Sequence, residues 1–464
     1  MNLNFFNHQT KTVGRAAIIL TFSALFSRFL GIIRDWLLAR TFGASPELDV
    51  YFAAFKIPDF VYNVLIMGGI SVAFLPLFSE YFSKNEKEAW EFTSNSLNVF
   101  LVLLISLSLL LFILTPQLVR IIAPGFSLTQ KDLTISLTGL MLLSPIFFGL
   151  SAILSGVLQY FNRFLVYSLC PLLYNLGIIF GILFLQPRFG VLGVALGVIL
   201  GAFSHFAIQI PSVLNCGFSL KPIFNFKDSR LKRVFVLMIP RTFGVASQQL
   251  NLIFINAIAS TLATGSIAIF NFANNIQYFP IGIVGVSVAI AAFPALAKNW
   301  AEDQKEKFIE KFYLAFKQIL YFVLPASILI FFFRNLIVNI LLRHGNFSLE
   351  AARLTEGCLG LFSLSIFASS LIPLIFRAFF SFQDTKTPTL ISLISMGLNI
   401  ILAYFLTWFL KFDSLFKGFL ANIFSLKGIE NISVLGLSLA VTVSTIFQFV
   451  LMMIFLKKRI KQNN

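Results

Sequence analysis

Charged side chains lie inside the first two apolar segments of this sequence. Arg28, Arg34 and Asp35 fall in the first segment, and Asp49 and Lys56 fall in the second. An ionised group near the centre of a bilayer costs about 2.5 to 3.5 kcal/mol on insertion scales, so such residues normally face a bundle interior or a water-filled cavity. The sequence therefore predicts a polar site within a membrane domain.

The spacing of these residues predicts a polar face on the first helix. Residues seven apart return to nearly the same side of a helix that has about 3.6 residues per turn. Ser27 therefore shares a face with Arg34, and Arg28 shares a face with Asp35. Guanidinium groups on such a face can hold phosphate oxygens in bidentate pairs, and a neighbouring carboxylate can orient them. We expect Arg28 and Arg34 to bind a phosphorylated group and Asp35 to orient Arg34.

The second apolar segment repeats the seven-residue spacing. Asp49 shares a face with Lys56, and Asp59 lies three residues beyond Lys56, close enough to neutralise it. Two interpretations are open. The charges can line a binding cavity, or they can form salt bridges that only hold the two helices together. We favour the cavity, because the basic residues outnumber those that neutral pairing requires.

Composition places the chain among polytopic membrane proteins. It has 464 residues, of which 58% are hydrophobic and only 12% are charged, and this far exceeds the apolar content of an ordinary soluble domain. The three cysteines stand singly in apolar surroundings, which argues against disulfides and thiolate metal sites. The three histidines lie far apart, and no G-x-x-x-x-G-K-[ST] loop is present. We expect no catalytic residues, no metal and no cofactor, and hence no enzyme.

Twelve apolar segments are long enough to cross a hydrocarbon core of about 30 Å, which takes roughly 20 residues each. An uncharged run from 242 to 297 is divided at the A-T-G-S sequence of 263–266, because a single helix would be too long. The segments lie near 14–40, 47–80, 91–115, 133–160, 163–186, 190–214, 234–261, 266–297, 312–342, 354–383, 387–410 and 432–456.

The distribution of basic residues predicts the orientation. Of the 35 Lys and Arg residues, twenty-one fall on one side of the predicted spans and ten on the other. Cytoplasmic loops carry the excess, so both termini should lie in the cytoplasm, with the chain in a bacterial cytoplasmic (inner) membrane. The polar opening segment shows no cleavage site after the first apolar run, so we expect the first helix to be retained. No basic stripe suggests nucleic-acid binding.

Weak internal similarity divides the chain into two sets of six helices. Arg28-Phe-Leu-Gly31 resembles Arg241-Thr-Phe-Gly244, and S-V-A-F-L-P ending at Pro76 resembles A-I-A-A-F-P ending at Pro294. Six helices return the chain to its starting side, so the copies should be parallel and related by a pseudo-two-fold axis along the membrane normal. The predicted fold is all-α, with six-helix lobes at 1–225 and 226–464 around a central cavity.

Several motifs resemble those of the MurJ (MviN) lipid II flippases, which belong to the multidrug/oligosaccharidyl-lipid/polysaccharide exporter superfamily. They are S-R-F-L-G-I-I-R-D, F-G-A-S-P-E-L-D, A-F-K-I-P, P-R-T-F-G, F-P-I-G-I-V-G-V and R-A-F-F-S-F-Q-D-T-K-T-P. The resemblance runs from about Thr12 to the last helix. It implies transfer of an undecaprenyl-pyrophosphate-linked peptidoglycan precursor from the cytoplasmic to the outer leaflet. The residues that we expect to bind the substrate are Ser27, Arg28, Arg34, Asp35, Asp49, Lys56, Arg241 and Asn275.

The sequence also departs from the family pattern. Tyr62 and Asn63 stand where members usually have consecutive arginines, and Asn274-Asn275 stand where Asp-Arg is usual. These changes remove cations from the cavity that the resemblance implies. Ile255 and Ala403 fall where sodium-binding members have aspartates, so we expect no such sodium site. The family typically continues for two further helices, which form a groove for the polyprenyl tail.

The sequence thus predicts a lipid II flippase that works by alternating access. The expected partners are the lipid-linked peptidoglycan precursor and membrane lipids, with cell-wall synthesis enzymes as further candidates, and we expect a monomer. One alternative is the export of another lipid-linked oligosaccharide or of an amphipathic cation. Another is a relative that does not transport and serves as a scaffold for wall synthesis.

Overall fold

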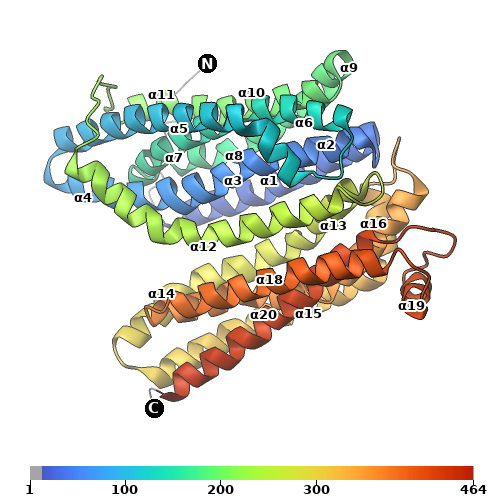
Figure 1. Ribbon diagram of the computed structural model, residues 1–464. Coiled ribbons are helices and arrows are strands. Elements are labelled where there is room, and N and C mark those ends of the chain that lie inside the picture. Colours follow the sequence, from blue (N-terminus) through green and yellow to red (C-terminus); the bar gives the residue numbers. More distant parts are fainter. Residues whose placement is uncertain (1–12, 463–464) are drawn as a thin grey trace. The chain divides into compact units, whose positions relative to one another are not determined.

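A computed structural model describes residues 13–462 and leaves the side chains of residues 13, 15–17, 240, 241, 243, 244 and 462 undescribed. Every regular element in the described residues is a helix (Figure 1). The predicted all-α class is therefore confirmed. The polar opening segment, which the sequence predicts to be retained, lies at 1–12, outside these residues.

The chain packs as two compact units. The first unit contains the described residues up to Thr41 together with Val50–Ile253. The α2 helix (Pro46–Ala54) enters this unit at Val50, and α12 (Ser229–Ala259) extends beyond its end. Its other elements are α1 (Val13–Phe42), α3 (Lys56–Val61), η2 (Tyr62–Ile70), α4 (Ser71–Lys84), α5 (Glu86–Ile122), α6 (Leu128–Met141), α7 (Ser144–Tyr160), α8 (Phe164–Phe180), η3 (Gly181–Leu185), α9 (Gln186–Phe189), α10 (Val191–Ala207) and α11 (Gln209–Leu214).

The second unit contains Phe42–Asp49 and the described residues from Phe254 onward. The lobe boundary predicted at residue 225 concerns the two halves of a repeat, which packing alone does not test, so it stays a prediction. The elements of this unit are α13 (Ser266–Pro280), η4 (Ile281–Val286), α14 (Ser287–Ala301), α15 (Lys305–Leu341), α16 (Leu349–Ser363), α17 (Ile366–Ser381), α18 (Lys386–Phe409), α19 (Leu415–Ile423) and α20 (Val434–Gln462).

The helices have the lengths that membrane crossing requires. Among the described residues, nine helical segments are long and apolar enough to span a bilayer, and a tenth is added if α16 and α17, bent by 46°, count as one span. The remaining two predicted segments correspond to α1 and α12, which have 30 and 31 residues but carry more charge. The twelve predicted apolar segments are thus all helical.

Structural features recur at matching places in the two halves of the sequence. A glycine with positive φ follows the first long helix of each half, at Gly43 and Gly265. A π-helical segment, η2 or η4, precedes each of the matched proline motifs. Two further residues with positive φ, Asn162 and Gln383, stand at the corresponding turns before α8 and α18. The weak sequence repeat therefore corresponds to a repeated order of elements.

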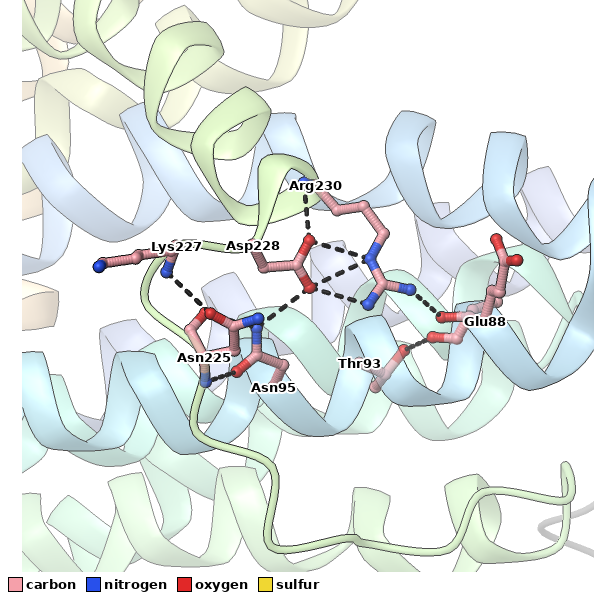
Figure 2. Close-up of polar contacts among 8 residues, drawn as sticks. Glu88, Thr93, Asn95, Asn225, Lys227, Asp228 and Arg230 are labelled. Carbon is pink, nitrogen blue, oxygen red and sulfur yellow. Dashed lines mark hydrogen bonds and ion pairs between the residues drawn. The ribbon is translucent and has the colours of Figure 1, made fainter.

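A loop that precedes α12 is fastened to α5 (Figure 2). Asn95 donates its amide to the backbone oxygen of Asn225 at 3.0 Å and to the carboxylate of Asp228 at 3.3 Å, and it accepts from the amide of Asn225 at 2.8 Å. Arg230 donates to Asp228 at 2.8 Å and to the backbone oxygen of Glu88 at 3.1 Å. These contacts hold the start of α12 against the first unit.

Asp228 is the charged centre of this attachment. Its burial favours the neutral carboxyl, but the hydrogen bonds and charge of Arg230 outweigh that effect and lower the pKa of Asp228. A lowered pKa in the folded state stabilises the protein at pH values above the unfolded pKa, which is about 3.9 for aspartate. This stabilisation is lost as the pH falls through the folded pKa.

We predict that Asp228→Asn lowers the free energy of unfolding by about 1–3 kcal/mol at neutral pH, because Arg230 loses its buried anionic partner. The difference from the wild type should shrink in acid, where the wild-type carboxyl is itself protonated. Thermal unfolding in detergent micelles measures the change. Asp413→Asn is the control, because Asp413 is 98% exposed in its pair with Lys417 and should contribute little. Equal losses in both variants would contradict the prediction.

Candidate functional site

A hydrogen-bond network joins the polar face of α1 to α8. Arg34 donates Nε and Nη2 to Oδ1 of Asp35, at 3.0 and 2.9 Å, and donates Nη1 to Oδ1 of Asn175 at 3.2 Å. Asn175 in turn donates Nδ2 to the hydroxyl of Ser27 at 3.3 Å. The structure thus brings together three of the predicted residues, Ser27, Arg34 and Asp35. Asn175, which sequence reasoning missed, links them to α8.

A cavity of about 610 Å³ lies within the first unit next to this network. Arg28 and Ser27 both line it, so Arg28 faces an open space rather than a dry helix contact. Among the described residues that line the cavity, Arg28 is the only Lys or Arg. The other polar side chains in the lining belong to Ser23, Tyr62, Ser71, Ser155, Gln159, Tyr167, Ser168 and His205.

Polar side chains of α7, α10 and α11 form a second network behind the cavity. Ser151 lies 2.7 Å from Nδ1 of His205, Gln209 donates to Ser151, and Ser155 donates to Gln209 at 2.9 Å. Ser155 and His205 are also part of the cavity lining. The signal for these residues was present in the sequence as a row of Ser151, Ser155 and Gln159, four residues apart, which places them on one helical face.

Aromatic rings complete one wall of the cavity. The rings of Tyr62 and Phe148 lie 4.8 Å apart, and Phe148 also contacts Tyr174 and His205 edge-on. Tyr62 occupies one of the positions where the sequence lacks an expected arginine, and it lines the cavity. Its neighbour Asn63 donates to the backbone oxygen of Asp59 at 2.9 Å. The cavity wall at this point is aromatic and neutral.

The α3 helix carries the charged pair predicted for the second apolar segment. Lys56 and Asp59 are both partly buried there, and Asp59 interacts electrostatically with Lys56 and with Arg34. The three charges therefore lie in one region of the first unit. Neither Lys56 nor Asp59 is among the residues that line the cavity, so their charges act on its contents only from behind the wall.

Asp49 occupies a different place from the other predicted residues. Its carboxylate is 4% exposed and accepts from the backbone amides of Gly265, at 2.6 Å, and Ala268, at 2.8 Å, within the second unit. A carboxylate at a helix N-terminus satisfies amides that have no partner inside the helix and interacts favourably with the helix dipole. Asp49 therefore caps α13 in this structure, whereas the sequence pointed to a pairing with Lys56.

Two predicted residues are not brought to this cavity by any described contact. Asn275 is an exposed residue of α13 in the second unit. The side chain of Arg241, in α12, lies outside the described residues. The expectation that these two residues bind substrate stays a prediction.

Comparisons with known proteins give a consistent family. The family model described as "Lipid II flippase MurJ" matches residues 38–464. A protein of Buchnera aphidicola subsp. Acyrthosiphon pisum, named "Probable lipid II flippase MurJ", is 30% identical over 399 residues, which cover 85% of this chain and 78% of that protein.

Solved structures agree with these matches. The structure titled "Lipid II flippase MurJ, inward closed conformation" has a TM-score of 0.77 and 26% identity, with 95% of this chain and 87% of that chain covered. An inward-facing multidrug resistance MATE transporter has the same TM-score of 0.77 at 14% identity, covering 97% and 98% of the two chains. The second likeness is one of fold.

We predict that Asp49→Ala frays the start of α13. Loss of an N-cap side chain costs about 1–2 kcal/mol, which corresponds to about tenfold faster hydrogen exchange of the amides at Gly265 and Ala268. Hydrogen-exchange mass spectrometry of peptides that cover these amides measures the effect. Glu47→Ala removes an exposed carboxylate from the same helix, α2, and should leave the exchange unchanged. Unchanged exchange in Asp49→Ala would show that the carboxylate does not cap the helix.

Proposed function

Because this chain belongs to the MurJ family of lipid II flippases, we propose that it transfers lipid II from the cytoplasmic to the outer leaflet of the membrane. The observation that carries the proposal is the polar cavity of the first unit, which is lined by Arg28 and neutral hydrogen-bonding groups within an apolar helical bundle. A pyrophosphate that bears sugars needs such a place, because hydrocarbon offers no replacement for the water that it loses.

Arg28 is the proposed ligand of the pyrophosphate. Its guanidinium can donate two parallel hydrogen bonds to phosphate oxygens, and a charge-assisted pair of this kind is stronger than a neutral one. The hydroxyls of Ser23 and Ser155 and the amide of Gln159 supply donors and acceptors for sugar hydroxyls. The ring of Tyr62 offers a flat apolar surface to a sugar ring.

Arg34 has a positioning role in this proposal. Its guanidinium is engaged by Asp35 and Asn175, so its contacts hold α1 against α8 and fix the direction of the polar face. Lys56 and Asp59 contribute charge behind the cavity wall. A partly neutralised set of this kind limits the free energy cost of the empty cavity, since an unpaired buried charge is strongly destabilising.

The transport cycle that we propose is alternating access. Binding of the head group favours one of two conformations by as much as its affinity for them differs, and release at the outer leaflet lets the empty carrier return. The protein acts as a transporter and not as an enzyme. It is a multi-pass inner membrane protein, for which we propose a monomer with both termini in the cytoplasm and with cell-wall synthesis enzymes as neighbours.

A second candidate function follows from the neutral wall of the cavity. Tyr62 and Asn63 replace two expected cations, so the cavity can favour another lipid-linked oligosaccharide with a different head group. A scaffold without transport activity is the remaining possibility from the sequence. Titration of the purified protein with lipid II and with other polyprenyl-pyrophosphate saccharides separates these functions, because a scaffold should bind none of them.

We predict that Arg28→Ala abolishes flipping. Loss of one charge-assisted contact to phosphate is worth about 1.5–3 kcal/mol, or roughly ten- to a hundredfold in affinity. Complementation of a bacterium depleted of its own lipid II flippase gives the readout. Arg40→Ala is the control, because Arg40 is an exposed residue of the same helix that stacks on Trp36. Growth supported equally well by Arg28→Ala and the wild type would refute the assignment of Arg28.

A further inference from the structure

An apolar groove of about 200 Å³ lies between η2, α5 and α12. Its walls include Leu65 and Ile70 from η2, Leu103 and Leu104 from α5, and Phe235 and Ile239 from α12. The hydroxyl of Thr242, at one end, donates to the backbone oxygen of Ile239 at 2.8 Å and is satisfied within its own helix. The groove therefore offers a ligand apolar surface and almost no hydrogen bonding.

The groove and the polar cavity are separated by the single π-helical segment η2. Tyr62, Ile66 and Met67 of η2 line the cavity, whereas Leu65 and Ile70 line the groove. Behind η2, Gly149 of α7 stands between the two spaces. A methyl group built on Gly149 would lie 2.2 Å from Leu104 and 3.8 Å from Ile66. One layer of side chains thus divides a cavity that holds a cation from an apolar groove.

The groove belongs entirely to the first unit. The α12 wall approaches η2 closely because Gly69 has no side chain, and a Cβ at this position would lie 2.5 Å from Met238. The start of α12 is held by Asp228 and Arg230, and Arg233 adds two hydrogen bonds to the carboxylate of Glu80 on α4. These contacts fix the three walls relative to one another.

We propose that the groove holds the first isoprene units of the substrate's polyprenyl chain while the head group occupies the polar cavity. This inference rests on the proposed function and assigns the tail a place in the first unit. The polyprenyl chain begins directly at the pyrophosphate, so a phosphate held by Arg28 brings the first carbons to η2. The acyl chains of a phospholipid begin instead at ester groups, for which the groove has no free donor.

Exposure at the rim supports the same occupant. Ile239 is 56% exposed, and Leu103 is exposed on the facing helix. A chain that enters the groove can therefore leave it again into the bilayer, where the remaining isoprene units stay. Burial of only the first units also suits a carrier, because binding that is too strong would slow release.

The test fills the groove with a larger side chain. Leu103→Trp and Ile239→Trp are compared with Val102→Trp and Val236→Trp, which change exposed residues of the same two helices outside the groove, Val236 being 58% exposed. The probes are the lipid II head group with a farnesyl chain and the same pyrophosphoryl head group without a chain. Affinities are measured with the full-length protein in detergent micelles.

In the wild type the farnesyl chain should raise the affinity at least about tenfold, since each buried methylene contributes to binding. The two groove variants should lose most of this gain and keep the wild-type affinity for the chain-free head group. The control variants should keep both. Retention of the gain in the groove variants, or its loss in the controls as well, would overturn the inference but leave the proposed function standing.

A second measurement covers a failure of the tryptophan variants to fold. A photoreactive amino acid at 239 should crosslink to the farnesyl chain, and the same residue at 236 should not. Crosslinks from 239 to phospholipid alone would reject the polyprenyl occupant. If the chain-free head group binds no form of the protein, including the wild type, the proposed function itself fails.

Discussion

The energetic cost of an ionised side chain inside a membrane is the constraint on which this structure depends. Arg28 and Arg34 lie on one helix of a chain that is 58% hydrophobic, and hydrocarbon would penalise either of them by several kcal/mol. The protein meets this cost in two ways. Arg34 is hydrogen-bonded to Asp35 and Asn175, and Arg28 lines a cavity. The first arrangement stabilises the fold, and the second leaves a cation for a ligand.

Much of this arrangement could be predicted from the sequence, because it depends on local spacing. The apolar runs gave the helices, and the seven-residue interval between Ser27 and Arg34 placed both on one face. The interval did not reveal Asn175, the residue that joins them, because it lies on α8, far along the chain. The row of Ser151 and Ser155 on α7 was visible in the sequence, but serine in an apolar helix gives no strong signal.

Asp49 shows where local reasoning ends. Its interval to Lys56 fits a shared helical face, yet its carboxylate caps α13 through amides more than two hundred residues away. The chain passes from the second unit to the first immediately after Asp49, so a helical face that continues in sequence does not continue within one packed unit. Spacing can predict which residues share a helix, but it cannot predict which distant backbone a carboxylate will meet.

The first unit places a polar cavity and an apolar groove on opposite sides of η2, which matches the amphipathic chemistry of a lipid-linked saccharide. Native mass spectrometry of the full-length protein purified from bacterial membranes tests this account most directly. It should detect one bound polyprenyl-pyrophosphate saccharide on the wild type and loss of that species from Arg28→Ala. Phospholipids as the only bound lipids, in equal amounts on both proteins, would contradict the account.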